Sequence, residues 1–186
     1  MVRIFLVLLC LGSGPAVAGD CPAPTDTSEQ IGALLEEVGR ASNEMSARLL
    51  TNRMWEIWAT APDEAAQELL DHGMEARRSY NLTEALSAFD RLIAYCPDYA
   101  EGYNQRAFVN FMREDYAPAL TDLDRAIALS PDHVAAAAGR ALTLLGMGRI
   151  AEGQAALRAV LKRHPWLPER AHLIPEDQSP GAGTKL

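Results

Sequence analysis

The most informative segment of this chain is residues 100–133, which read AEGYNQRAFVNFMREDYAPALTDLDRAIALSPDH. Apolar residues in its second half recur at spacings of three and four, the period of an amphipathic helix. The small residues Ala107 and Ala119 allow two antiparallel helices to approach closely. Leu123 then fills the space one turn further on, and Pro131 ends the second helix. The segment therefore predicts two helices joined by a short turn.

The same pattern recurs with a period of 34 residues, because Pro97, Pro131 and Pro165 are each 34 residues apart. Taking each proline as position 32 of a unit gives the units 66–99, 100–133 and 134–167. Positions 8 and 20 are small and position 24 is large and apolar: Gly73, Ala85 and Phe89, then Ala107, Ala119 and Leu123, then Ala141, Gly153 and Leu157. A single helix pair cannot bury both of its faces, so the units are expected to stack.

This register resembles that of the tetratricopeptide repeat (TPR) family, whose unit is a helix–turn–helix of 34 residues. The resemblance implies an all-α fold, a TPR-like α-solenoid of antiparallel helix pairs. The three units would be TPR 1, TPR 2 and TPR 3.

Residues 28–65 are predicted to form an N-terminal helix pair, either a degenerate repeat or a cap. Ser28 precedes an amphipathic pattern, and a second apolar face follows it, which includes Trp55 and Trp58. The two tryptophans could form a platform for a stacked ligand, but terminal repeats normally act as caps. We therefore expect them to seal the open end of the solenoid.

The two ends of the chain carry different signals. Residues 1–18 combine a cationic start, an eight-residue apolar run at 4–11 and a final Ala-Val-Ala, which predicts a signal peptide cleaved after Ala18. That run is too short to span a bilayer. Residues 19–27 are then expected to be a flexible linker. At the other end, 168–174 are predicted to form a capping segment and 175–186 a disordered tail.

Two cysteines, Cys21 and Cys96, remain after removal of the signal peptide. In an oxidising compartment they can form a disulfide. Cys21 lies in a proline-rich segment, however, and nothing in the sequence holds that segment near Cys96. The sequence leaves the pairing open.

Composition and motifs argue against several functions. The net charge of −8 makes binding of nucleic acid unlikely in the physical sense, because phosphate contacts need a cationic face. The four histidines, His72, His133, His164 and His172, show none of the close pairs that metal sites use. No nucleophile–base motif or phosphate-binding loop occurs either. We therefore predict no enzyme activity, no cofactor, no metal site and no membrane insertion of the mature chain.

The resemblance implies a concave groove lined by the first helix of each pair. The candidate partner-binding residues in this groove are Leu70, Met74, Arg77, Asn104, Phe108, Phe111, Leu142 and Leu145. The positions that hold a terminal carboxylate in the best-known TPR groove carry Leu70, Met74, Gln105, Ala135 and Gly139 here, which argues against that mode. Some of the candidate side chains could instead pack between helices.

These observations predict a non-enzymatic scaffold or adaptor that binds a segment of another protein or peptide in the groove. The resemblance and the signal peptide together suggest the bacterial cell envelope, with the protein in the periplasm. The alternative is a structural or self-associating module whose groove is filled by its own tail or by a second copy.

Overall fold

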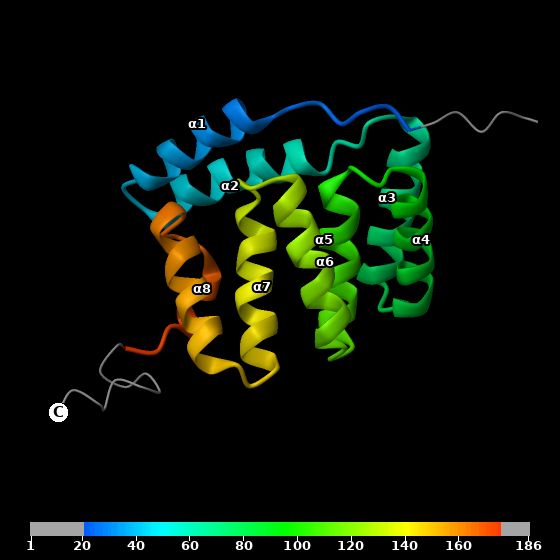
Figure 1. Ribbon diagram of the computed structural model, residues 1–186. Helices are drawn as coiled ribbons and strands as arrows, with labels where there is room; N and C mark the ends of the chain where they lie inside the picture. Colours follow the sequence, from blue (N-terminus) through cyan, green and yellow to red (C-terminus); the bar gives the residue numbers. More distant parts are fainter. Residues whose placement is uncertain (1–20, 176–186) are drawn as a thin grey trace, which may run out of the picture.

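The computed structural model describes residues 21–175 (Figure 1). This part of the chain forms eight α-helices and one 3-10 helix, with no β-strand. The helices are α1 (Ser28–Gly39), α2 (Glu44–Trp58), α3 (Glu64–Arg78), α4 (Leu82–Tyr95), α5 (Ala100–Met112), α6 (Tyr116–Leu129), α7 (Val134–Gly146), α8 (Ile150–Arg163) and η1 (Pro168–His172). None of the described helices has the length and apolarity needed to cross a membrane. The predicted signal peptide and residues 176–186 of the predicted tail lie outside the described residues.

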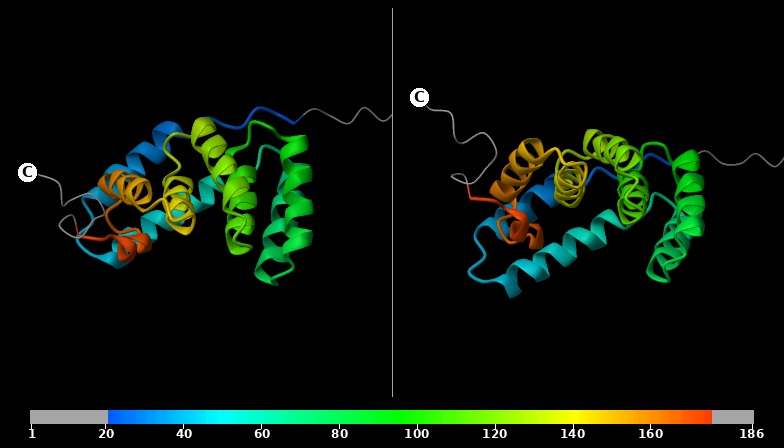
Figure 2. Two further views of the ribbon diagram at one scale, coloured as in Figure 1. Left: turned by 60° about the horizontal axis from the view of Figure 1, so that its bottom comes forward. Right: turned by 90° about the horizontal axis from the view of Figure 1, so that it is seen from below.

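Helices α3 to α8 form three antiparallel pairs, which stand side by side in a curved row (Figures 1 and 2). The all-α solenoid predicted from the 34-residue period is therefore confirmed. The small residue at position 8 shows why the period matters. A Cβ atom added to Gly73 on α3 would lie 2.4 Å from Cε1 of Phe89 on α4, so only glycine permits this approach of the two helices.

The turn within each helix pair has the same backbone geometry in all three repeats. Tyr80, Glu114 and Gly148 occupy equivalent positions and have φ angles of 59°, 62° and 74°. This left-handed conformation is free for glycine but costs roughly 1 kcal/mol for other residues. The first two repeats therefore accept local strain to close the hairpin, whereas the third does not.

Helices α1 and α2 lie across one end of the row, where the turns between repeats gather (Figure 1). Seen from below, α2 crosses the open side of the arc (Figure 2). The apolar face of α1 does not pack on the first repeat but on the last one. It forms one buried cluster with α7 and α8, whose members are Ile31, Leu34, Leu35, Val38, Met54, Trp58, Val134, Ala138, Ala141, Leu157, Val160 and Leu167.

This position differs from the one expected, a cap on the open end of the first repeat. The outer face of that repeat is polar and needs no cover: His72 on α3 and Glu84 on α4 lie there, 2.8 Å apart and both exposed. The apolar sides of α7 and α8, in contrast, would face water without α1. The N-terminal pair therefore covers the repeat that has most apolar surface to bury.

Residues 168–174 run along α8, to which they are held by hydrogen bonds. The Gln154 side chain donates to the His172 carbonyl at 2.7 Å and accepts from the Ile174 backbone N–H at 2.8 Å. Arg170 of η1 also reaches Glu44 of α2 at 3.0 Å. This segment therefore joins α8 to the beginning of α2.

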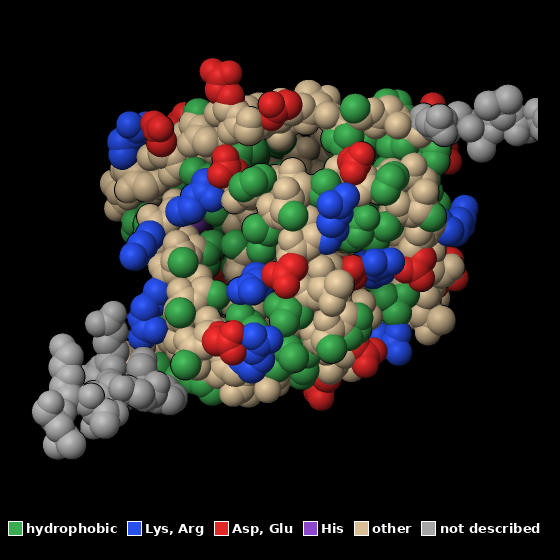
Figure 3. All heavy atoms as spheres, viewed as in Figure 1, with side chains coloured by type: hydrophobic (Ala, Val, Ile, Leu, Met, Phe, Trp, Pro, Cys, Tyr) green, Lys and Arg blue, Asp and Glu red, His purple; other side chains and the backbone are tan. Residues whose placement is uncertain are grey.

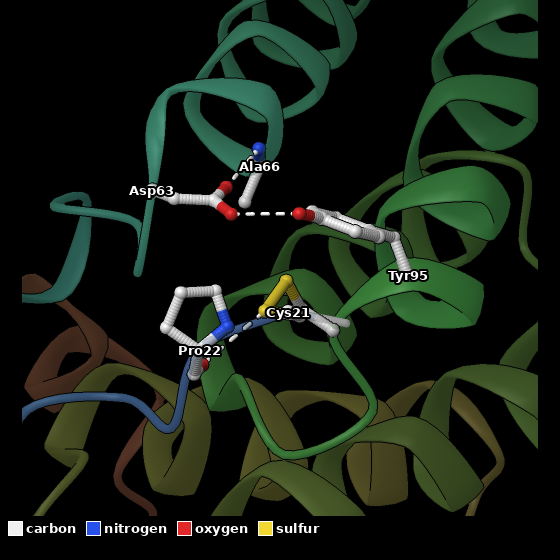
Figure 4. Close-up of a disulfide and its surroundings, with 6 residues drawn as sticks. Cys21, Pro22, Asp63, Ala66 and Tyr95 are labelled. Atoms are coloured by element: carbon white, nitrogen blue, oxygen red, sulfur yellow. Dashed lines mark hydrogen bonds between the residues drawn. A yellow bond between two sulfur atoms is a disulfide. The ribbon is translucent and has the colours of Figure 1, made fainter. Parts of the chain in front are cut away.

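Cys21 and Cys96 form a disulfide, with their Cα atoms 5.2 Å apart (Figure 4). Beside it, the Tyr95 hydroxyl donates to Asp63 Oδ2 at 2.7 Å, and Asp63 Oδ1 caps α3 by accepting from the Ala66 N–H at 2.8 Å. The expected flexible linker is thus tied at Cys21 to the turn between α4 and α5. From there residues 21–27 run along the ends of the repeats to α1 (Figure 1).

Candidate partner-binding surface

The concave side of the row is lined by α3, α5 and α7, and α2 divides it into two parts. Near the turns between repeats, α2 lies over the beginnings of α5 and α7. Towards the ends of α3, α5 and α7 the surface is free of α2 (Figure 2). The eight predicted groove residues therefore do not have equal access to a partner.

Two of the predicted residues lie in the covered part. Leu70 is completely buried and packs in a cluster that includes Ala59 and Ala61 of the connection between α2 and α3. Asn104 is buried as well, and its amide Nδ2 donates to Glu101 Oε2 at 3.1 Å. Neither side chain is available to a partner, because a segment of the same chain covers both helices at this level.

The covered part contains a buried polar network that the sequence analysis missed. Glu101 is 1% exposed and accepts hydrogen bonds from Asn104, from Gln105 Nε2 at 2.5 Å and from His133 Nε2 at 2.8 Å. His133 Nδ1 accepts the N–H of Ala136 at the beginning of α7, so the proton of the neutral ring is on Nε2. The network is thus an ionised carboxylate with three neutral donors.

Trp58 connects α2 to this network. Its ring stacks on that of His133, with centroids 4.1 Å apart and planes 10° from parallel. The Tyr99 hydroxyl donates to the Trp58 carbonyl at 2.6 Å, and burial raises the pKa of Tyr99 well above its ordinary value. Trp58 is therefore the residue at which the end of α2 is fixed to the first turns of α5 and α7.

His164 holds the middle of α2 against the end of α8. The Thr51 hydroxyl donates to the Ala47 carbonyl at 2.8 Å, so its oxygen accepts from His164 Nε2 at 2.8 Å. His164 Nδ1 is buried and has no hydrogen-bond partner among the described residues. Burial lowers the pKa of His164 below its usual value, because the charged ring would lose its hydration.

This environment predicts a pH dependence of stability. A histidine whose pKa is lowered by folding stabilises the protein fully above its unfolded pKa of about 6.5, and this stabilisation is lost as the pH falls towards the folded pKa. We therefore expect the urea midpoint to fall between pH 7 and pH 5. His164→Gln keeps a donor for Thr51 but cannot be protonated, so its midpoint should fall less over the same range.

Equal slopes for the wild type and His164→Gln would contradict this assignment. His72→Gln is the matched control, because His72 is exposed on α3 and α4 and far from α2 in the fold. It should follow the wild type.

The free part of the concave side contains the other six predicted residues. Phe111 and Leu145 are largely used inside the repeats. Phe111 contacts Tyr116 edge to face, with ring centroids 5.7 Å apart, and Leu145 fills the space above Gly153. The remaining four residues form what we call the open surface: Met74, Arg77, Phe108 and Leu142.

Phe108 is the most exposed of these side chains, at 46%. The Arg77 guanidinium lies over its ring, 4.6 Å from the centroid, in a cation–π contact. Met74 and Leu142 are half-buried on the neighbouring helices α3 and α7. The open surface is thus an apolar strip with one positive charge.

A cavity of about 690 Å³ lies beneath residues 24–31 and is visible as a hollow in Figure 3. Its rim carries Asp98 and Asp132, but these carboxylates are paired with Arg125 and Arg163 at 3.3 and 2.6 Å. Within residues 21–175, no group of three or more His, Cys, Asp or Glu side chains is arranged to hold a metal ion. The cavity therefore offers no evident chemistry.

Comparison with known proteins agrees with the repeats. Residues 111–173 match the tetratricopeptide repeat family model. A TPR repeat-containing protein of Rhizobium etli is 26% identical over 129 residues, 68% of this chain and 62% of that protein. A tetratricopeptide repeat protein 36 homolog of Nematostella vectensis is 40% identical over 73 residues, 39% of this chain and 40% of that protein. The chain thus spans less than two thirds of the length of these relatives.

Among solved structures, the first TPR domain of Spaghetti (RPAP3), bound to the HSP90 peptide SRMEEVD, superposes with a TM-score of 0.56 at 20% identity. The alignment covers 57% of this chain and 85% of that domain. This likeness shows the fold, an α-helical solenoid of the TPR type. Together with the family model and the relatives, it supports the tetratricopeptide repeat family for the repeat region.

Proposed function

We propose that this protein is a non-enzymatic adaptor, which binds a segment of a partner protein on the open surface. The observation that carries the proposal is the exposure of Phe108 at the centre of a concave face. A phenylalanine that is 46% exposed and flanked by Met74 and Leu142 leaves apolar area in contact with water. Apolar area of this kind in a concavity is typical of sites that bind a peptide or helix.

The solved relatives support the general mode but not the same ligand. The RPAP3 domain holds its HSP90 peptide, and the chain described here shares its fold. The positions that would hold a terminal carboxylate are Leu70, Met74, Gln105, Ala135 and Gly139, none of which is charged. A different class of segment is therefore proposed for this protein.

The proposed place of action is the periplasm of a bacterium. The signal-peptide pattern of residues 1–18 supports export. The disulfide between Cys21 and Cys96 supports it independently, since disulfides persist in oxidising compartments.

Self-association is a second candidate function. The concave side is partly filled, but by α2 of the same chain rather than by the tail or a second copy. Met45 and Leu49 on the outer face of α2 are 64% and 60% exposed and are separated by one helical turn. A dimer seen by sedimentation at micromolar concentration, and lost in Met45→Asp/Leu49→Asp, would favour this candidate.

The proposed function is tested by selecting peptides from a random display library on the wild type and on Phe108→Asp. Selected peptides should bind the variant about 30-fold more weakly, the usual effect of removing a central apolar anchor. Met45→Asp is the matched control, because it places the same charge on an exposed apolar site outside the open surface. Circular dichroism would establish that both variants fold.

Two results would contradict the proposal. One is a library from which no peptide is enriched on the wild type. The other is a set of peptides that bind Phe108→Asp and the wild type equally well.

A further inference from the structure

Partly buried arginines in this protein are paired, with one exception. Five arginines of the described residues are partly buried: Arg77, Arg106, Arg140, Arg158 and Arg170. Four of them donate hydrogen bonds to carboxylates or backbone carbonyls: Arg106 to Asp90 and Asp122, Arg140 to Asp124, Arg158 to Ile174, and Arg170 to Glu44 and Trp166. Within residues 21–175, Arg77 has neither a hydrogen-bond acceptor nor an ion pair. This exception lies on the open surface.

The surroundings of Arg77 make its lack of an acceptor costly. Its Nε is buried and has no partner among the described residues. Burial lowers the pKa of Arg77, while the charge of Glu101 acts in the opposite direction. The guanidinium remains protonated because arginine titrates far above physiological pH. A partly desolvated cation with free N–H groups is thus held over Phe108, 4.6 Å from the ring centroid.

Glu101 is the nearest candidate acceptor within the protein, but its oxygens are already used. Oε1 accepts from Gln105, and Oε2 accepts from Asn104 and His133. The carboxylate is 1% exposed and lies in the part of the concave side that α2 covers. Glu101 therefore favours the charge of Arg77 at a distance without satisfying its donors.

We propose that Arg77 anchors an aspartate or glutamate side chain of the partner segment, while an adjacent apolar side chain of that segment packs on Phe108. This inference rests on the proposed function and adds to it the chemistry of the partner. Arginine holds a carboxylate with two parallel N–H···O bonds, which are short and strong when partly removed from water. The contact with Phe108 fixes the plane of the guanidinium before the partner arrives.

A side-chain carboxylate fits this site better than the carboxylate at the end of a chain. Terminal carboxylates are usually captured by several converging donors. Here the amides of Asn104 and Gln105 are committed to Glu101, and Met74 and Leu142 have no donor at all. One guanidinium next to an apolar strip matches one acidic side chain next to an apolar residue.

The test uses two libraries of random peptides, both acetylated at the N-terminus. One library is amidated at the C-terminus and the other keeps its free carboxylate. On the full-length protein, peptides enriched from the amidated library should contain Asp or Glu beside a bulky apolar residue. A selected peptide should bind Arg77→Gln about tenfold more weakly, as expected when a charge-assisted hydrogen bond is lost.

The specific contact is isolated by a double-mutant cycle. Replacing the acidic residue of the peptide by its amide should weaken binding to the wild type about tenfold. The same replacement should have little effect on binding to Arg77→Gln, because the partner of that carboxylate is already absent. Arg78→Gln is the matched control, since Arg78 is exposed and pairs with Glu75 at 2.6 Å.

The outcomes separate this inference from the function on which it rests. Peptides that need Phe108 but carry no acidic residue would overturn the role of Arg77 and leave the proposed function intact. Peptides enriched only with a free C-terminal carboxylate would also overturn it, in favour of a chain terminus. If no peptide binds the wild type at all, both proposals fail.

Discussion

Replacing Cys21 by serine is expected to lower the free energy of unfolding by about 4 kcal/mol, the value for a loop of this length in the chain-entropy treatment of disulfides. The bond joins residues 75 apart in sequence, so it removes many conformations from the unfolded chain. Cys21 is the better site for the substitution, because it is partly exposed, whereas Cys96 is buried among apolar side chains. Urea unfolding of oxidised wild type and variant would measure the difference.

Reduced wild-type protein and Cys21→Ser/Cys96→Ala serve as controls, and both should unfold near the midpoint of the single variant. The loss should also be visible locally. Residues 21–27 contain no helix and are tied to the repeats at Cys21, so Cys21→Ser should make this segment more sensitive to protease. Two free thiols in non-reduced wild-type protein would contradict the disulfide itself.

The repeats could be predicted from the sequence because their packing is local. Gly73 faces Phe89, and Gly153 faces Leu145, within one helix pair whose members are close in the chain. The same small and large residues recur every 34 positions, so each pair repeats the information of the others. A periodic signal of this kind states both which face is buried and what covers it.

The position of the N-terminal pair could not be predicted, although its apolar face was visible. The spacing of Ile31, Leu34 and Val38 shows that one side of α1 is buried, but it does not name the partner. That partner includes Val134 and Val160, which lie about a hundred residues further along the chain. The pairing of Cys21 with Cys96 depends on this same long-range arrangement, which explains why the sequence left it open.

The binding surface was predicted in part for the same reason. Phe108 and Arg77 follow from the repeat register, which places them on the concave side. The burial of Leu70 and Asn104 depends on α2 and on its connection to α3, which the register does not describe. A buried carboxylate such as Glu101 gives no signal of its own in the sequence, since an isolated glutamate on a helix is normally exposed.

Trp58→Ala is expected to destabilise the protein by about 3–5 kcal/mol, the usual cost of truncating a buried tryptophan. Trp58 is 5% exposed, stacks on His133 and belongs to the cluster that joins α1 and α2 to the last repeat. Its backbone carbonyl would still accept from Tyr99, so the loss reports the side chain alone. Amide hydrogen exchange should rise mainly in α1 and α2, because the three repeats keep their own clusters.

Trp55→Ala on the same helix provides the matched comparison. Trp55 is 37% exposed and contacts Trp58 edge to face, with ring centroids 5.5 Å apart, so its removal should cost about 1 kcal/mol. If the two variants were equally stable, the end of α2 would not be packed on His133. The covered part of the concave side would then be open to partners as well. A large difference between the variants would instead mean that a partner meets only the open surface, with Phe108 and Arg77 at its centre.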